Sequence, residues 1–249
     1  MKIWYQSFTH PDEARPYQAR LQAYLAGAAK PGATFNLAGM DPPSRKHRIT
    51  ELRCALDVVR NALRAEQEGY DAFILGHFQD SGLWEARSAV KIPVIGLGEQ
   101  TMLHACTLGG RIGLITIDPY YIPFHEEQVR KYGLSQRVVA VSAVKTSAED
   151  YVRAIQNAEG RRAIREQYQA QIDGLVARGI EVIIPAGGFP SMLLEDEKDM
   201  NLGGAILLNG LGVVVKAAEG AVDLRRLNGT GPSRMSTFAP PSAAALKTL

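Results

Sequence analysis

A histidine stands at the end of a short apolar run, where a side chain can meet a bound ligand. The segment 72–78 begins with Ala, Phe, Ile and Leu and reaches Gly76 and His77, and Asp80 and Ser81 follow in a polar loop. This pattern predicts a buried parallel strand that ends in a loop opening a helix. Ligands of open α/β proteins bind outside the carboxyl ends of such strands. Because imidazole exchanges a proton near neutral pH, we expect His77 to act as an acid–base group; the alternative is a histidine that only ties down the loop.

The elements that would position this histidine alternate between strand and helix along the chain. Strand patterns occupy 2–5, 33–40, 72–78, 91–98, 111–117, 138–144, 180–186 and 205–208, and helical patterns occupy most of the segments between them. Such alternation predicts an α/β fold with parallel sheets covered by helices. Eight units also fit a closed barrel. Gly109 and Gly110 break the chain near its middle, and 72–78 and 182–186 end alike, which favours two half-size sheets.

We therefore expect two α/β halves and a tail. The first half is 1–109, completed by the helix 211–226, and the second is 110–210. The tail 227–249 is rich in Gly, Pro, Ser, Thr and Ala, so it is expected to be disordered or to lie across a neighbouring subunit. A homo-oligomer is expected.

One long helix is indicated at 48–68 by apolar positions at helical spacing. Ile49, Leu52, Leu56 and Val59 are among them. His47 and His125 fall in helical contexts and are expected at the surface.

The composition excludes several classes of partner. The 249 residues carry a net charge of +2, with 46% hydrophobic and 22% charged residues, as in an ordinary globular protein. The charge gives no reason to expect nucleic acid or a membrane as partner. No signal peptide opens the chain, and no apolar run approaches the ~18 residues of a membrane span, so a cytoplasmic protein is expected. Cys54 and Cys106 are too few for a metal site or a disulfide framework.

Four motifs in order resemble the aspartate/glutamate racemase superfamily, and within it the hydantoin racemase branch. The loop 76–83, Gly-His-Phe-Gln-Asp-Ser-Gly-Leu, is similar to the family's Gly-Cys-Phe-Gly-Asp-Pro-Gly-Leu. The segment 93–104, the strand 111–116 and the helix start 210–219 match further family patterns. The resemblance covers about residues 1–225. It implies two pseudo-symmetric flavodoxin-like halves with the active site in the cleft between them.

The resemblance also exposes a departure in the catalytic groups. The family uses two cysteines, one from each half, on opposite faces of the substrate carbon. Here His77 stands at the first position and the second falls at about Gly187, while Cys54 and Cys106 match neither strand end. The two-thiol mechanism therefore cannot operate in this chain.

Other site residues follow from position. The resemblance places Ser7 and Thr9 in the substrate-anchoring loop, and Thr116 at an equivalent strand end. Gly187 and Gly188 offer backbone N–H groups for a carboxylate or an oxyanion, or they form a tight turn that simply needs glycine. We expect these five residues and Phe78 to contact substrate, with Asp80 and Glu99 orienting loops.

One acid–base group without an opposite partner favours one-sided chemistry. We expect an enzyme acting on a small carboxylate or cyclic amide, at a carbon next to a carbonyl, by proton transfer through His77. Isomerisation and decarboxylation both fit. The alternatives are a hydrolase in which His77 activates water, and a non-catalytic binding relative. His77, Asp80, Glu99 and His104 could converge on a metal ion such as zinc, but we expect neither metal nor cofactor.

Overall fold

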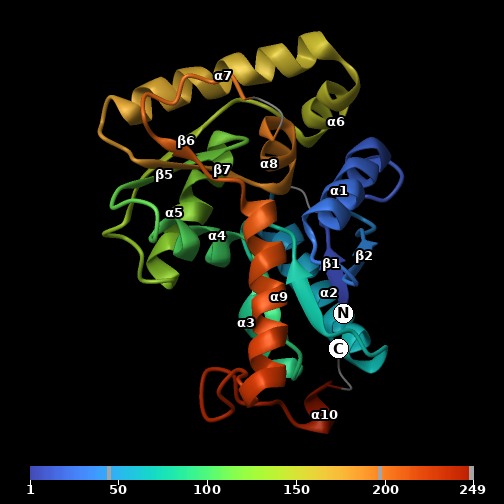
Figure 1. Ribbon diagram of the computed structural model, residues 1–249. Helices are drawn as coiled ribbons and strands as arrows, with labels where there is room; N and C mark the ends of the chain where they lie inside the picture. The colour runs from blue at the N-terminus through green and yellow to red at the C-terminus, as the bar shows by residue number, and fades with distance from the viewer. Residues whose placement is uncertain (44–45, 196–197, 247–249) are drawn as a thin grey trace.

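The computed structural model describes residues 1–43, 46–195 and 198–246 and contains two four-stranded parallel sheets (Figure 1). The first sheet has the order β2-β1-β3-β4, and the second repeats it as β6-β5-β7-β8. The halves are therefore pseudo-symmetric, as expected, and the closed barrel is excluded. The strands are β1 Lys2–Gln6, β2 Thr34–Ala38, β3 Ala72–Leu75, β4 Val94–Gly96, β5 Ile112–Thr116, β6 Val138–Ala143, β7 Val182–Ala186 and β8 Ile206–Leu207.

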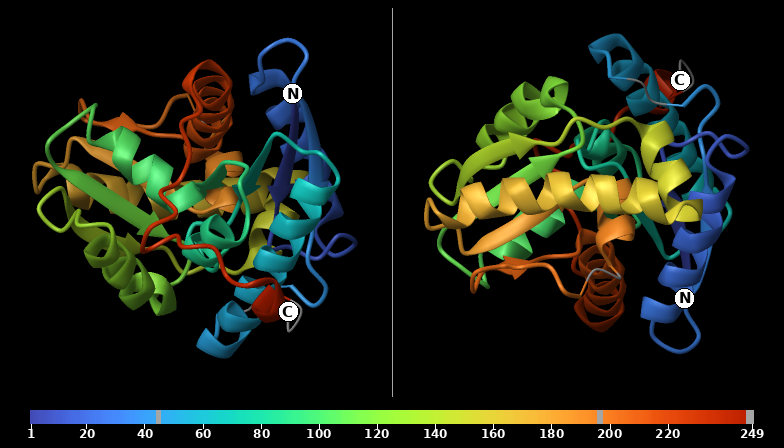
Figure 2. Two further views of the ribbon diagram at one scale, coloured as in Figure 1. Left: turned by 90° about the horizontal axis from the view of Figure 1, so that it is seen from below. Right: turned by 90° about the horizontal axis from the view of Figure 1, so that it is seen from above.

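Helices cover both faces of each sheet (Figure 2). In the first half and its connections these are α1 Arg15–Ala28, α2 Arg48–Gln67, α3 Leu83–Ala89 and α4 Leu97–Ala105. The second half adds η1 Pro119–Tyr121, α5 Ile122–Lys131, α6 Ala148–Gln156, α7 Ala158–Val176 and α8 Gly188–Leu194, and the chain closes with α9 Gly210–Asn228 and α10 Ala243–Leu246.

The inner strands are apolar because helices bury them from both sides. All four residues of β3 and all five of β7 are buried, as parallel strands between two helical layers require. Pro185 is tolerated inside β7 because β8 pairs with β7 only at Val182 and Ile183, so no neighbour on that side needs its missing N–H.

Helix α9 joins the two halves. It runs along their boundary in Figure 1 and packs against α4, β3 and β4 of the first half and against α8 and β7 of the second. The side chain of Asn209 caps its first turn by accepting from the N–H of Leu211. Helix α9 thus contacts elements of both halves.

The segment after α9 folds back on its own chain. In the left view of Figure 2 it runs from the end of α9 across the molecule. Arg234 donates to the carbonyls of Arg87, Ser88 and Val90 at the end of α3. This contact satisfies carbonyls that the end of a helix leaves without intrahelical partners.

Helix α2 forms where its spacing predicts, but it turns a different face inward. Ile49, Leu52 and Leu56 are 72%, 60% and 40% exposed, whereas Glu51 and Cys54 are buried. A carboxylate therefore enters the interior from the first turn of α2. Within the described residues, no helix has the length and apolar character needed to cross a membrane.

Candidate active site

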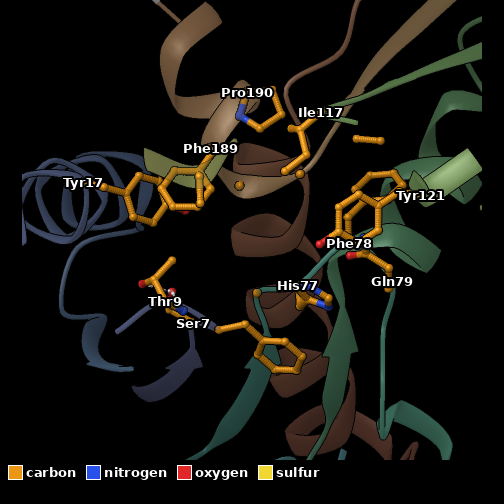
Figure 3. A pocket seen from close by; sticks show the side chains of 16 residues that line it. Ser7, Thr9, Tyr17, His77, Phe78, Gln79, Ile117, Tyr121, Phe189 and Pro190 are labelled. Atoms are coloured by element: carbon orange, nitrogen blue, oxygen red, sulfur yellow. Dashed lines mark hydrogen bonds between the residues drawn. The ribbon is translucent and has the colours of Figure 1, made fainter. Parts of the chain in front are cut away.

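A cavity of about 100 Å³ lies where the carboxyl ends of the two sheets face each other (Figure 3). The residue directly after each of the four inner strands lines it: Ser7 after β1, Gly76 after β3, Ile117 after β5 and Gly187 after β7. Both halves therefore build one site. The other lining residues are Phe8, Thr9, Tyr17, His77, Phe78, Gln79, Tyr121, Ala148, Ala186, Gly188, Phe189 and Pro190.

His77 enters this cavity with one nitrogen already turned away. Its Nδ1 faces Oε2 of Glu51 at 3.5 Å, and its side chain is 16% exposed. The ring stacks on Phe8, with centroids 4.1 Å apart and planes 20° apart. Burial lowers the pKa of His77 below its ordinary value, and the Glu51 carboxylate raises that pKa in part. His77 is therefore a neutral imidazole near pH 7, with Nε2 as the nitrogen available to a ligand.

Glu51 is a site residue that the sequence did not reveal. It is 6% exposed and accepts a 2.6 Å hydrogen bond from Ser81 Oγ, in the loop that carries His77. A carboxylate behind Nδ1 favours the tautomer with the proton on Nδ1, which leaves Nε2 as a proton acceptor. Glu51 would have been recognised from the sequence if the buried face of this helix had been assigned correctly, because an acidic residue among buried apolar ones is unusual.

The loop after β1 presents hydroxyl groups to the cavity. Ser7 Oγ and Thr9 Oγ1 are 2.8 Å apart, and Thr9 Oγ1 also accepts from Gln18 Nε2 at 3.0 Å. Both residues line the cavity. Because these bonds fix the two side chains, they are oriented before any ligand arrives.

The two glycines after β7 differ in what their amides can do. The N–H of Gly187 donates to the carbonyl of Pro185 at 2.9 Å, so it is already used within the turn. Gly188 begins α8, and its N–H has no partner among the described residues. Of these two glycines, Gly188 therefore has the amide that a ligand could use, whereas the sequence suggested both.

Thr116 does not reach the cavity. It is fully buried, and its Oγ1 lies 3.1 Å from Nε2 of His125. His125, expected at the surface, is also fully buried, and its Nδ1 lies 3.2 Å from Oε1 of Gln128. Burial lowers the pKa of His125 to about 4. Thr116 thus belongs to the interior of the second half, and Ile117 takes its place in the cavity wall.

Asp80 ties the loop of His77 to the start of α4, whereas the carboxylate of Glu99 pairs with α3. Asp80 accepts from the N–H of Gly98 and of Glu99 at the start of α4, and from Tyr132 Oη at 2.8 Å. Burial raises the pKa of Asp80 to about 7, against the effect of these donors. The carboxylate of Glu99 forms a two-pronged ion pair with Arg87. Neither residue lines the cavity.

The described residues contain no group of three His, Cys, Asp or Glu side chains placed to hold a metal ion. Among the four residues that could converge on a metal, Asp80 and Glu99 make the contacts described above, and His104 is exposed on α4.

The family model for Asp/Glu/hydantoin racemases matches residues 15–218. The hydantoin racemase of Pseudomonas sp. (strain NS671) is 26% identical over 208 residues, which cover 81% of this chain and 77% of that protein. The hydantoin racemase of Rhizobium meliloti is 28% identical over 179 residues, covering 72% and 69%. Among solved structures, allantoin racemase from Klebsiella pneumoniae superimposes with a TM-score of 0.79 at 22% identity, covering 97% of this chain and 94% of that one. With its paired sheets and shared cavity, this chain belongs to the Asp/Glu/hydantoin racemase family.

Proposed function

We propose that this protein racemises a hydantoin, a cyclic amide with a hydrogen on the carbon next to a ring carbonyl. His77 removes or returns that proton on one face of the ring. The observation that carries the proposal is the position of His77, a neutral imidazole at a strand end in the cavity between the halves. The names of the two curated relatives support the same substrate class.

The charge of the cavity favours a cyclic amide over an amino acid. No Lys or Arg is among the residues that line it in the described part of the chain. An amino acid would bring a carboxylate into the cavity, where an unpaired charge is costly to bury. A hydantoin is uncharged and needs only hydrogen bonds, which Ser7, Thr9, Gln79 and Gly188 are placed to supply.

The proton transfer places negative charge on an oxygen. When His77 Nε2 takes the proton, the electron pair of the C–H bond moves onto the neighbouring carbonyl as an enolate. Neutral donors fixed near that oxygen stabilise the enolate more than the ground-state carbonyl. The hydroxyls of Ser7 and Thr9 and the N–H of Gly188 are the candidates.

A second cavity adjoins the first and gives space for a ring substituent. It measures about 360 Å³ and shares Phe8, Thr9, Ala148 and Phe189 with the first. Its remaining wall comes mainly from α6, including Val152, and from residues of the segment 10–14 that precedes α1. We assign the ring to the smaller cavity and the substituent to the larger one.

The test is proton NMR in D2O with 5-methylhydantoin, 5-benzylhydantoin, allantoin, amino acids and substituted malonates. We expect the wild type to exchange the α-proton of at least one hydantoin and to racemise it. His77→Asn should lose about 10³-fold in rate, within the usual range for an acid–base group. His104→Asn, an exposed histidine on α4, is the matched control and should behave as wild type.

Other results would contradict the proposal. If only an amino acid exchanged its α-proton, the substrate would be an amino acid rather than a hydantoin. If a malonate lost CO2, or if the hydantoin ring were hydrolysed, the reaction would be a decarboxylation or a hydrolysis rather than a racemisation. Binding without exchange, unaffected by His77→Asn, would favour a non-catalytic relative.

A further inference from the structure

The site has an ionisable side chain at the end of β3 and none at the end of β7. His77 follows β3, whereas Gly187 and Gly188 follow β7. Racemisation requires a proton to leave one face of a carbon and to arrive on the other. A single group at the end of β3 therefore leaves the second transfer without a donor, unless another element supplies one.

Helix α1 brings a hydroxyl to this position. A Cβ at Gly188 would overlap Oη of Tyr17, and its next neighbour beyond Tyr17 would be the carbonyl oxygen of Gly76, at 3.8 Å. The Tyr17 hydroxyl thus occupies the space where a side chain of residue 188 would begin. A phenol from the first half thus lies beside residue 188, which follows the position that corresponds to the family's second cysteine.

The ring of Tyr17 is packed in place, and its hydroxyl is available for a hydrogen bond. The residue is 2% exposed, and its ring packs against Phe189 with centroids 4.3 Å apart. It lines the cavity, and no hydrogen bond joins its Oη to another group in the described residues. Figure 3 shows Tyr17 and His77 entering from different sides of the cavity. Unlike Tyr5 Oη, Tyr17 Oη is not among the buried side-chain oxygens that lack a partner, so it is open to the cavity and can bond to a ligand there.

Another tyrosine nearby lacks this access. Tyr5 is fully buried, its hydroxyl also has no partner among the described residues, and its ring lies directly under Gly76. It does not line the cavity. Of these two phenols, Tyr17 alone can reach a ligand.

We propose that Tyr17 is the second acid–base group of the site and acts on the face of the ring opposite His77. The inference rests on the proposed racemisation. His77 Nε2 takes the α-proton, and the C–H electron pair moves onto the carbonyl as an enolate. The C–H bond then re-forms on the other face with the proton of Tyr17 Oη, which leaves a phenolate and an imidazolium. The reverse direction uses the same two groups in exchanged roles.

The protonation states match these roles. Burial raises the pKa of Tyr17 above that of an ordinary phenol, so the hydroxyl is protonated near pH 7. Burial lowers the pKa of His77, so the imidazole is neutral and able to accept. The resting pair is therefore a base and an acid, as one direction of the reaction requires.

The experiment follows each enantiomer of 5-benzylhydantoin separately in D2O, by NMR for exchange and by chiral chromatography for inversion. Tyr17→Phe removes one oxygen and keeps the ring. We expect inversion to fall at least about 100-fold, while one enantiomer still exchanges its α-proton with retention through His77. His77→Asn should abolish exchange of that same enantiomer. Tyr24→Phe, on the same helix and outside the cavity, is the control.

If the wild type is active, two results would overturn the role of Tyr17 but leave the proposed function intact. One is inversion by Tyr17→Phe within about fivefold of wild type. The other is equal loss of exchange from both enantiomers in a variant whose urea midpoint is unchanged, which would indicate a binding role. A wild type that neither exchanges nor inverts any hydantoin would instead refute the proposed function, and the inference with it.

Discussion

Gln128 of the second half donates a 2.5 Å hydrogen bond to the backbone carbonyl of Phe78 in the first half, next to His77. Its Nε2 also donates to Asp80 Oδ2 at 3.0 Å, and its Oε1 meets His125. A Cβ at Gly98 would overlap both Gln128 and the Phe78 carbonyl, so glycine is required there for the two halves to approach. One buried amide thus connects the loop of His77 to α5.

Replacing Gln128 with Leu should therefore affect both stability and activity. The change removes a donor from two buried acceptors, Phe78 O and Asp80 Oδ2. We expect a loss of about 2–4 kcal/mol in the free energy of unfolding, measured by urea denaturation, with a drop in kcat/KM because the His77 loop is released. Gln136→Leu, at an exposed position, is the control. Equal urea midpoints for the two variants would show that the amide does not link the halves.

The stability of the protein should fall in mild acid because of His125. Its pKa of about 4 in the folded protein lies below the ordinary 6.5, so the unfolded chain binds the proton more readily. The contribution is complete above pH 6.5 and is lost as the pH falls toward 4. It amounts to up to about 3 kcal/mol. Urea denaturation at pH 7, 5.5 and 4 should show a shallower loss for His125→Asn than for wild type. Parallel curves would contradict this.

The pH dependence of turnover should follow the pKa of His77, which Glu51 modifies. Because the pKa of His77 is lowered, kcat/KM should hold down to a pH below 6.5 and then fall. The carboxylate of Glu51 raises that pKa in part. Glu51→Gln should thus shift the acid limb to still lower pH, and the rate should fall about 10- to 100-fold as the imidazole loses its orientation. Glu126→Gln, an exposed change on α5, should leave the profile unchanged. An upward shift in Glu51→Gln would contradict the assignment.

Substrate size should be set by the larger cavity. Val152 of α6 lines it and does not line the smaller one. Val152→Trp should lower kcat/KM for 5-benzylhydantoin at least about tenfold, while 5-methylhydantoin should change by less than about threefold, since overpacking affects only the occupant of that space. Equal losses for both substrates would place the substituent elsewhere.

The parts of the site that could be predicted are those that follow buried strands. Apolar runs mark strand ends, and parallel strands bring those ends together, so His77 and Gly188 could be found from their order in the chain. Ser7 is placed by the family resemblance. Thr116 does not line the cavity, in contrast to the expectation, because it is the last residue of its strand rather than the first residue after it. Its side chain turns to the interior, and the cavity takes Ile117 instead.

The residues contributed by helices could not be predicted in the same way. Apolar spacing located α2 but not its phase, since Ile49 and Leu52 are exposed and Glu51 is buried. Tyr17 looks like an ordinary core residue of α1, and only the three-dimensional contact with Gly188 distinguishes it. Contacts between a helix residue and a distant strand end depend on how the elements pack in three dimensions, and the periodicity of apolar residues does not predict that packing.

The cavity walls contain no sulfur among the described residues, and both cysteines lie elsewhere: Cys54 is buried in α2, and Cys106 lies just beyond α4. A thiolate is the form of cysteine that oxidants and alkylating agents attack. Imidazole and phenol side chains are not oxidised stepwise under mild conditions, as a thiolate is. A site built from His77 and Tyr17 would therefore keep working through an oxidative stress that silences a thiol-based relative, with no need for a reductant to restore it.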